Sequence, residues 1–144
     1  MLINKKSYNF MKTLIFFAFS RKRSFSIKEI SQRTSISSKV LEQVLLDLKN
    51  KGILNSKRGP RGGYTLAKDV SGLTLAGVIE MAGQKLCIMP PAGGQKKEII
   101  DEVFLSLGSA IGNYMEKKFD GITVADIVKK IGQRIGEGGL DYMI

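Results

Sequence analysis

The stretch from Ser26 to Lys68 constrains the fold most, because it combines two short helices, a tight turn between them, and a basic hairpin rich in Gly. Ser26 and Glu29 have the spacing of a capping box, which predicts the start of the first helix. Ser37 is a favourable N-cap for the second helix. Gly52 is the residue type that best tolerates the left-handed conformation closing a helix. This order predicts a winged helix-turn-helix, with the helix-turn-helix at 26–52 and the wing at 53–68.

The second helix of this unit is predicted to be amphipathic. Its apolar residues recur at helical spacing, so one side must face a core. These residues are Val40, Leu41, Val44, Leu45 and Leu48. The opposite side carries Lys39, Glu42, Gln43, Leu46 and Asn50.

The wing is predicted from the pentapeptide GPRGG at 59–63, which lies between two short strands at 53–58 and 64–67. Pro presets one turn dihedral and Gly permits positive ones, so the two strands should form a hairpin. Three cations lie at or beside its tip: Lys57, Arg58 and Arg61.

The charge of the chain is unevenly distributed, although its net value is +10. Residues 1–68 contain 15 Lys or Arg and 3 Asp or Glu, whereas residues 69–144 contain 8 and 10. The excess of positive charge therefore lies in the half with the helix-turn-helix, where a polyanion would bind. A basic surface kept only for solubility would not predict this division.

The segment LEQVLLDLKNKGILNSKRGPRGGYTLAK, followed by LTLAGVIEMAG, closely resembles the IscR/NsrR/CymR superfamily of bacterial winged-helix transcription regulators. Its most specific part is the motif RGPRGGY at 58–64, and the resemblance covers roughly residues 5–130. It implies a homodimer, expected to be a repressor, in which each recognition helix enters a major groove and each wing an adjacent minor groove. The alternative is a winged helix that binds RNA or DNA without sequence preference.

A two-fold dimer should read a nearly palindromic operator in double-stranded DNA. On the recognition helix, Lys39 can donate to guanine and Gln43 can pair with adenine, while Glu42 either accepts from cytosine N4 or pairs with Lys39. Ser37 and Ser38, at the helix N-terminus, are expected to hold a phosphate.

The remaining candidate DNA contacts are cations. On the wing, Arg58 and Arg61 are expected either to enter a narrowed minor groove or to contact phosphates only, and Lys57 lies beside them. The other cations, expected to contact phosphates without reading sequence, are Lys28, Arg21 and Arg23.

The longest predicted helix spans 96–119, with apolar residues every three or four positions. The resemblance implies that this helix forms the dimer interface. Its candidate interface residues are Ile100, Val103, Phe104, Leu107, Ile111 and Tyr114. Thr123 with Asp126 is predicted to cap a last short helix, 124–130. The remainder, 132–144, has four Gly in thirteen positions and is expected to be a flexible tail.

The segment 84–95 is predicted to be a loop because it contains two Pro and two Gly. In the cluster-binding branch of the superfamily this region holds three cysteines, whereas this chain has only Cys87 and no His. One thiolate does not supply the ligands of an iron-sulfur cluster, so no cofactor is expected. Cys87 is expected to be either a buried apolar residue or a redox thiol. The resemblance to the CymR-like branch suggests an effector metabolite or a regulatory protein as a further partner.

No catalytic set is present, so the chain is not expected to be an enzyme. An apolar stretch at 13–20 belongs to a predicted first helix at 5–20 and is too short to span a bilayer. The cations at 21–23 follow it in place of a small-residue cleavage site, so a cytoplasmic protein without a membrane partner is expected.

The expected fold is therefore mainly α with a small β-hairpin wing (α+β). Its expected parts are a winged helix-turn-helix domain at 1–83, the loop at 84–95, a dimerisation helix with a short return helix at 96–131, and the tail at 132–144.

Overall fold

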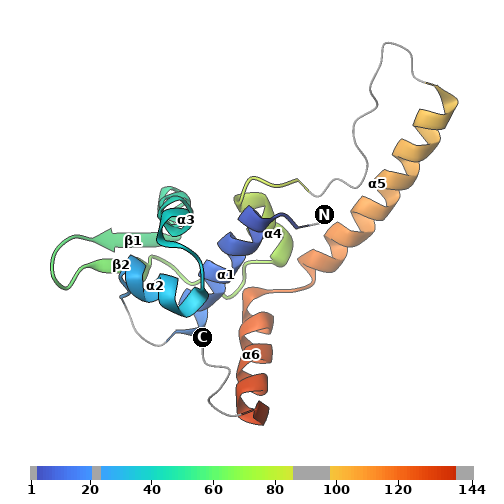
Figure 1. Ribbon diagram of the computed structural model, residues 1–144. Helices are drawn as coiled ribbons and strands as arrows, with labels where there is room; N and C mark the ends of the chain where they lie inside the picture. The colour runs from blue at the N-terminus through green and yellow to red at the C-terminus, as the bar shows by residue number, and fades with distance from the viewer. Residues whose placement is uncertain (1–2, 21–23, 86–97, 139–144) are drawn as a thin grey trace.

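The computed structural model describes residues 3–20, 24–85 and 98–138 (Figure 1). Within these residues it has six helices and one two-stranded antiparallel sheet, which confirms the expected fold class. The helices are α1 (Lys5–Phe19), α2 (Ile27–Thr34), α3 (Ser38–Asn50), α4 (Leu75–Met81), α5 (Ile99–Asp120) and α6 (Val124–Gly138). The strands are β1 (Leu54–Lys57) and β2 (Gly63–Leu66).

The helix-turn-helix begins as the capping box predicted. The Ser26 hydroxyl accepts from the Glu29 N–H at 3.2 Å, and the Glu29 carboxylate accepts from the Ser26 N–H at 2.8 Å. α2 ends at Thr34 and is followed by Ser35, whose φ of +55° is left-handed. The end of α3 is followed by Gly52 with φ +68°, the conformation for which Gly was expected there.

The core forms around α1, which packs against α2, α3, β2, α4 and α6. Three aromatic rings meet edge to face near its C-terminal end, Phe16, Phe17 and Phe25, with centroids 4.8–5.8 Å apart. Aromatic pairs favour this geometry because the positive edge of one ring meets the negative face of the next. From α3, four residues of the predicted apolar stripe are buried in the same core: Leu41, Val44, Leu45 and Leu48.

Val40, the fifth residue of that stripe, was expected in the core, and this expectation is wrong, because 41% of its surface is exposed. Successive residues are about 100° apart around a helix, so Val40 lies at one edge of the stripe, next to Val44 and about 100° from Leu41. The neighbouring elements cover the centre of the stripe and leave that edge open. Val40 therefore lies at the surface of α3.

The wing is hydrogen-bonded to the short segment that precedes α2. In the hairpin Leu54 pairs with Leu66 and Lys57 with Gly63, so the strands lie within a residue of their predicted positions. Phe25, which precedes α2, exchanges two backbone hydrogen bonds with Tyr64 at 2.8 and 3.0 Å. The base of the wing is therefore connected to the start of the helix-turn-helix.

α5 projects away from the other elements (Figure 1). Within the chain it packs against α4, and the Thr74 hydroxyl donates to the Asp120 carboxylate at 3.1 Å across that contact. The Asp101 carboxylate accepts from the Glu98 N–H at 3.3 Å, and the helix begins at Ile99, three residues later than expected.

The capping residues of α6 are as predicted, but its length is not. The Thr123 N–H and hydroxyl both donate to Asp126, which lowers the pKa of that carboxyl. The helix continues to Gly138, so the expectation of a flexible tail from 132 is wrong for 132–138. Ile131 and Ile135 continue the spacing of Ile127 and Val128, and all four are partly buried. This apolar stripe offsets the helix-weakening effect of the glycines.

None of the helices within the described residues is long and apolar enough to cross a bilayer.

Two adjacent leucines on α3 give a matched test of this core. Leu45 is fully buried and Leu46 is 49% exposed. Leu45→Ala leaves a cavity, so we expect it to lower the free energy of unfolding by about 2–5 kcal/mol. We expect Leu46→Ala to change it by less than about 0.5 kcal/mol. Urea denaturation at one protein concentration measures both, and equal losses for the two variants would contradict the packing of α3.

Candidate nucleic-acid interface

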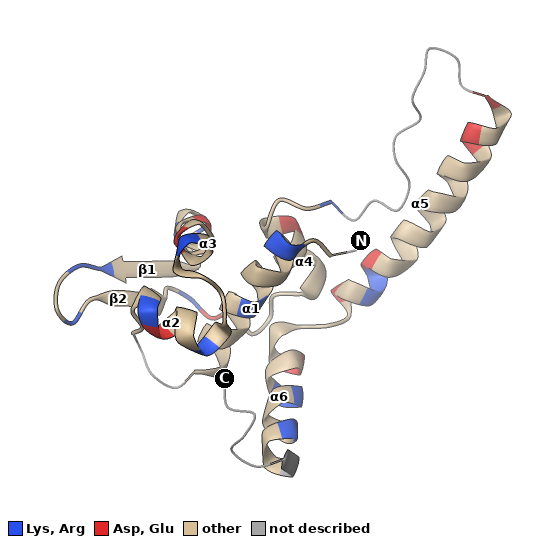
Figure 2. Ribbon diagram, in the orientation of Figure 1, with Lys and Arg blue, Asp and Glu red and all other residues tan. Residues whose placement is uncertain are grey.

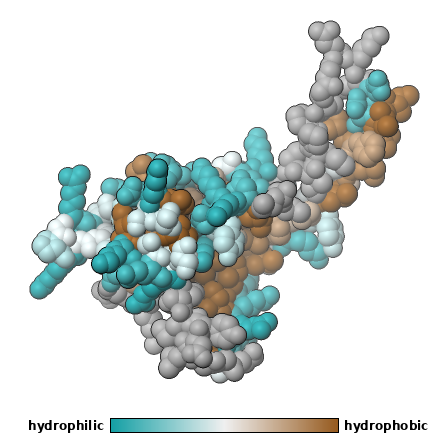
Figure 3. Space-filling view, viewed as in Figure 1, coloured by the Kyte–Doolittle hydropathy of each residue, from teal (hydrophilic) through white to brown (hydrophobic). Residues whose placement is uncertain are grey.

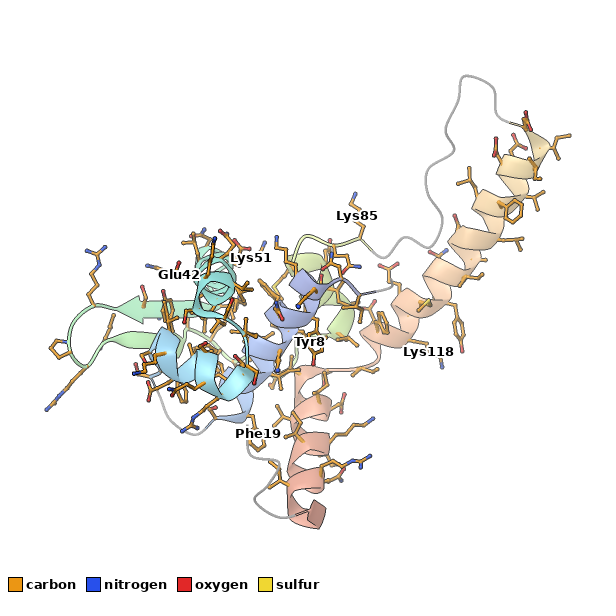
Figure 4. The ribbon with its side chains drawn as sticks, viewed as in Figure 1. Tyr8, Phe19, Glu42, Lys51, Lys85 and Lys118 are labelled. Carbon is orange, nitrogen blue, oxygen red and sulfur yellow. The ribbon has the colours of Figure 1, made fainter. Side chains whose placement is uncertain are left out.

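α2, α3 and the wing lie together at one end of the molecule, and Lys and Arg are present on all three (Figure 2). The outer face of α3 is exposed as the sequence predicted. Its exposed residues are Lys39, Glu42, Gln43, Leu46 and Asn50, and Figure 4 shows Glu42 on this outer side. Burial of the leucine stripe on the other side of α3 fixes which residues this face presents.

The N-terminus of α3 is open to solvent. Ser37 and Ser38 are exposed, and the Ser37 side chain forms no capping hydrogen bond. This differs from Ser26, whose hydroxyl caps α2. An uncapped helix start presents backbone N–H groups and a hydroxyl, which together suit a phosphate oxygen.

The polar residues on the outer face of α3 do not form the ion pair between Glu42 and Lys39 that was one of the two expected alternatives. Glu42 forms no ion pair with Lys39 in the structure, so its carboxylate remains available to accept a hydrogen bond. The Gln43 amide Nε2 instead donates to the Asp47 carboxylate at 2.8 Å. Asp47 also lies 3.8 Å from the Lys6 ammonium of α1.

Sequence reasoning missed Asp47 as part of this site. Its distance of four residues from Gln43 was a usable signal, because Gln and Asp at that spacing are neighbours on a helix. The contact with Lys6 depended on the fold.

The turn of the wing depends on two glycines of its motif. The Gly62 N–H donates to the Gly59 carbonyl at 2.9 Å, and a Cβ added to Gly62 would overlap the Lys57 carbonyl. Gly63 has φ +151°, and a Cβ there would lie 2.6 Å from the Phe25 carbonyl oxygen. The backbone therefore approaches itself too closely for any side chain at these positions.

The cations predicted to bind DNA lie around this turn and on α2. Lys57, Arg58 and Arg61 are exposed on the wing, and Lys28 is exposed on α2. Arg21 and Arg23 lie outside the described residues. Figure 2 shows the wing cations at the same end of the molecule as α2 and α3.

The predicted dimer face is on α5, away from this interface. Figure 3 shows hydrophobic surface along the helix. The six residues expected in the interface are each between 49% and 64% exposed: Ile100, Val103, Phe104, Leu107, Ile111 and Tyr114. No other element of the described chain covers this apolar face.

An open cavity of about 400 Å³ lies where α4 meets the C-terminal end of α5. It is lined by Ala76, Gly77, Glu80, Lys85, Glu116 and Asp120. Lys85 lies at the start of the predicted loop 84–95 and is the last described residue there, so this cavity is where α4, α5 and the start of that loop meet.

The ligand chemistry of the chain does not fit an iron-sulfur cluster. Such clusters are held by about four thiolate or imidazole ligands, and the chain has one Cys and no His. The described residues contain no group of three or more carboxylates that could hold a metal ion. Cys87 and the rest of the predicted loop from 86 lie outside the described residues.

Comparison of the amino-acid sequence with known proteins identifies relatives of this chain. The family model Rrf2, described as an iron-dependent transcriptional regulator, matches residues 3–130. A Synechocystis protein named as an HTH-type transcriptional regulator is 32% identical over 102 residues, which are 71% of this chain and 69% of that protein. The regulator IscR of Photorhabdus laumondii is 45% identical over 53 residues, 37% of this chain and 32% of IscR.

Solved structures show the same fold. IscR from T. potens is similar with a TM-score of 0.69 and 23% identity, covering 90% of this chain and 88% of that chain. CymR, the global cysteine regulator of B. subtilis, is similar with a TM-score of 0.66 and 24% identity, covering 90% of this chain and 98% of that chain.

The glycines of the wing motif give a test of the interface scaffold. We expect Gly63→Ala to lower the free energy of unfolding by about 1–3 kcal/mol, because the backbone must move away from Phe25. Gly72→Ala is the matched control, since a Cβ there meets nothing within 4 Å and should change stability by less than about 0.5 kcal/mol. Thermal unfolding measures both, and an unchanged Gly63→Ala variant would show that the wing base is not packed as described.

Proposed function

Because the chain belongs to the Rrf2 family of helix-turn-helix transcriptional regulators, we propose that it acts as a homodimer on a nearly palindromic operator and represses the adjacent genes. The observation that carries this proposal is the exposed polar face of α3 with a basic wing beside it. A dimer occupying a promoter blocks RNA polymerase by excluded volume, which is the simplest route to repression.

In the proposed complex α3 enters the major groove. Lys39, Glu42 and Gln43 face the bases, and Ser37 with Ser38 holds a phosphate at the helix start. The absence of a Lys39 pairing leaves Glu42 able to accept from cytosine N4. A carboxylate is repelled by the phosphate backbone, so its presence on this face favours a role in reading a base.

The wing and α2 supply the remaining proposed contacts. Arg58 and Arg61 extend from the exposed tip toward the adjacent minor groove, where a narrow groove concentrates negative potential. Lys57 and Lys28 are placed to contact phosphates, which adds affinity without sequence information.

We propose that a second copy of the chain covers the apolar face of α5. Large contiguous apolar patches on a surface mark interaction sites. A two-fold axis along this face would bring identical patches together, and it would also place two α3 helices at inverted half-sites.

We also propose that the protein binds its operator without an iron-sulfur cluster, since its residues do not supply the ligands. The regulatory signal would then come from a metabolite or a regulatory protein, and the protein would act where its DNA is, in the bacterial cytoplasm. We propose no enzymatic activity, because the chain has no His and no set of residues arranged for catalysis.

The alternative function is nucleic-acid binding without sequence preference. Such proteins stack bases on exposed aromatic side chains. Tyr64 is the aromatic residue nearest to the basic tip in the sequence, and it is partly buried against the core. Its burial favours sequence-specific binding to duplex DNA.

A binding titration tests the proposed function. The duplex upstream of the protein's own gene is compared with a scrambled duplex of equal length at two salt concentrations. We expect a preference of about 10³ or more for the natural duplex, together with a two-fold symmetric footprint. Equal binding to both duplexes that falls steeply with salt would instead indicate only electrostatic contact with phosphates.

A charge placed on the α5 face tests the proposed dimer. We expect Leu107→Glu to give monomers in analytical ultracentrifugation and to lower operator affinity by at least about tenfold, because a dimer would have to bury the carboxylate. Ser109→Glu adds the same charge to an exposed position on the other side of α5 and should remain dimeric. A dimeric Leu107→Glu variant would place the interface elsewhere.

A further inference from the structure

On the outer face of α3 the Gln43 side chain is hydrogen-bonded to a neighbour on the same helix, Asp47. Its Nε2 donates to the Asp47 Oδ1 at 2.8 Å. A carboxylate only accepts hydrogen bonds, so the nitrogen of the amide must face Asp47 and the oxygen must face away from it. Asp47 thereby determines which way the Gln43 amide is turned.

This orientation matters for the base that Gln43 can read. An amide pairs with adenine by accepting from N6–H with its oxygen and donating to N7 with its nitrogen. The Gln43 nitrogen carries two hydrogens, and Asp47 takes one of them. The edge of an adenine needs Oε1 together with the hydrogen cis to it, so the proposed pairing requires Asp47 to take the hydrogen trans to Oε1.

Asp47 is itself held by the first helix. Lys6 of α1 lies 3.8 Å from its second oxygen, Oδ2, while Oδ1 accepts from Gln43. The Asp47 side chain is 24% exposed, against 57% for Lys6, so the carboxylate is the more enclosed partner. An exposed ion pair adds little stability. The Lys6 ammonium does, however, place a positive charge beside the negative charge of Asp47.

We propose that Asp47 is a positioning residue for sequence recognition, holding the Gln43 amide in the orientation that reads an adenine in each half-site. This inference rests on the proposed function, because it requires α3 to enter the major groove. Asp47 does not touch the base itself. Its effect should therefore appear at one base pair of each half-site rather than across the operator.

The test begins with the operator selected from random duplexes by the wild-type protein, followed by Kd measurements for every single-pair substitution. Gln43→Ala identifies the pair that Gln43 reads as the one whose substitution penalty disappears. In the wild type we expect that pair to be A·T, with a penalty of about 5- to 150-fold, the range for a bidentate contact.

Two variants of Asp47 then separate orientation from charge. Asp47→Asn and Asp47→Leu both remove the negative charge and should alter overall affinity similarly. Asn keeps an oxygen that accepts from Gln43. The Asp47→Asn variant should therefore keep a penalty at that base pair within about twofold of the wild-type penalty. Leu has no acceptor, so its penalty should fall to within about twofold of that of Gln43→Ala, while the penalties at the other pairs stay unchanged.

Several outcomes would overturn the inference. If Asp47→Leu kept the wild-type penalty at the base pair that Gln43 reads, Gln43 would need no positioning by Asp47. If Asp47→Asn lost that penalty as fully as Asp47→Leu does, only the charge of Asp47 would matter. A uniform loss at every base pair would indicate a structural role for Asp47. A Gln43→Ala variant with unchanged preferences would remove Gln43 from base reading. If the wild-type protein itself showed no sequence preference, the proposed function would fail together with this inference. In each of the other outcomes the wild type still prefers its operator, so only the inference about Asp47 fails.

Discussion

The packing of α1 at the centre of the domain is the contact on which the rest of the structure depends. Its aromatic residues meet Phe25 just before α2, its buried face lies against α3, and α4 and α6 pack on it from other sides. Because leucines of α3 are fixed in this core, the opposite face of α3 is held outward. The same core holds Phe25, whose backbone pairs with Tyr64 at the base of the wing. One apolar cluster thus orients both parts of the candidate DNA interface.

Among the described residues, the outer face of α3 with the wing and the outer face of α5 remain exposed once this core has formed, and their chemistry differs. The outer face of α3 with the wing is polar and basic, which suits a polyanion. The outer face of α5 is apolar along its length, which suits a second apolar surface of the same kind. A homodimer bound to DNA satisfies both surfaces, and this complementarity supports the proposed function more than either surface does separately.

The chain departs from the iron-dependent description of its family in its ligand chemistry. A cluster needs several soft ligands in one region, and the chain has one Cys and no His. The family fold is nevertheless retained, and the helices pack on the apolar core around α1.

The sequence by itself determined the local elements of this protein. The capping box at Ser26, the Gly at 52, the GPRGG turn and the leucine spacing of α3 are local signals, and each was confirmed within a residue or two. Local signals suffice there because hydrogen bonds and allowed dihedrals within a few residues decide the outcome. The exposure of the α3 face followed from the same periodicity.

Only the tertiary structure decided how far each apolar stripe is covered and which distant side chains meet. Val40 was expected in the core but lies beyond the edge that the neighbouring elements cover. α6 extends to Gly138 because its apolar side continues through Ile131 and Ile135 despite the glycine at 132 between them. The approach of Lys6 to Asp47 joins residues 41 positions apart. Spacing along one helix describes only that helix, whereas coverage and long-range contacts depend on where the other helices pack.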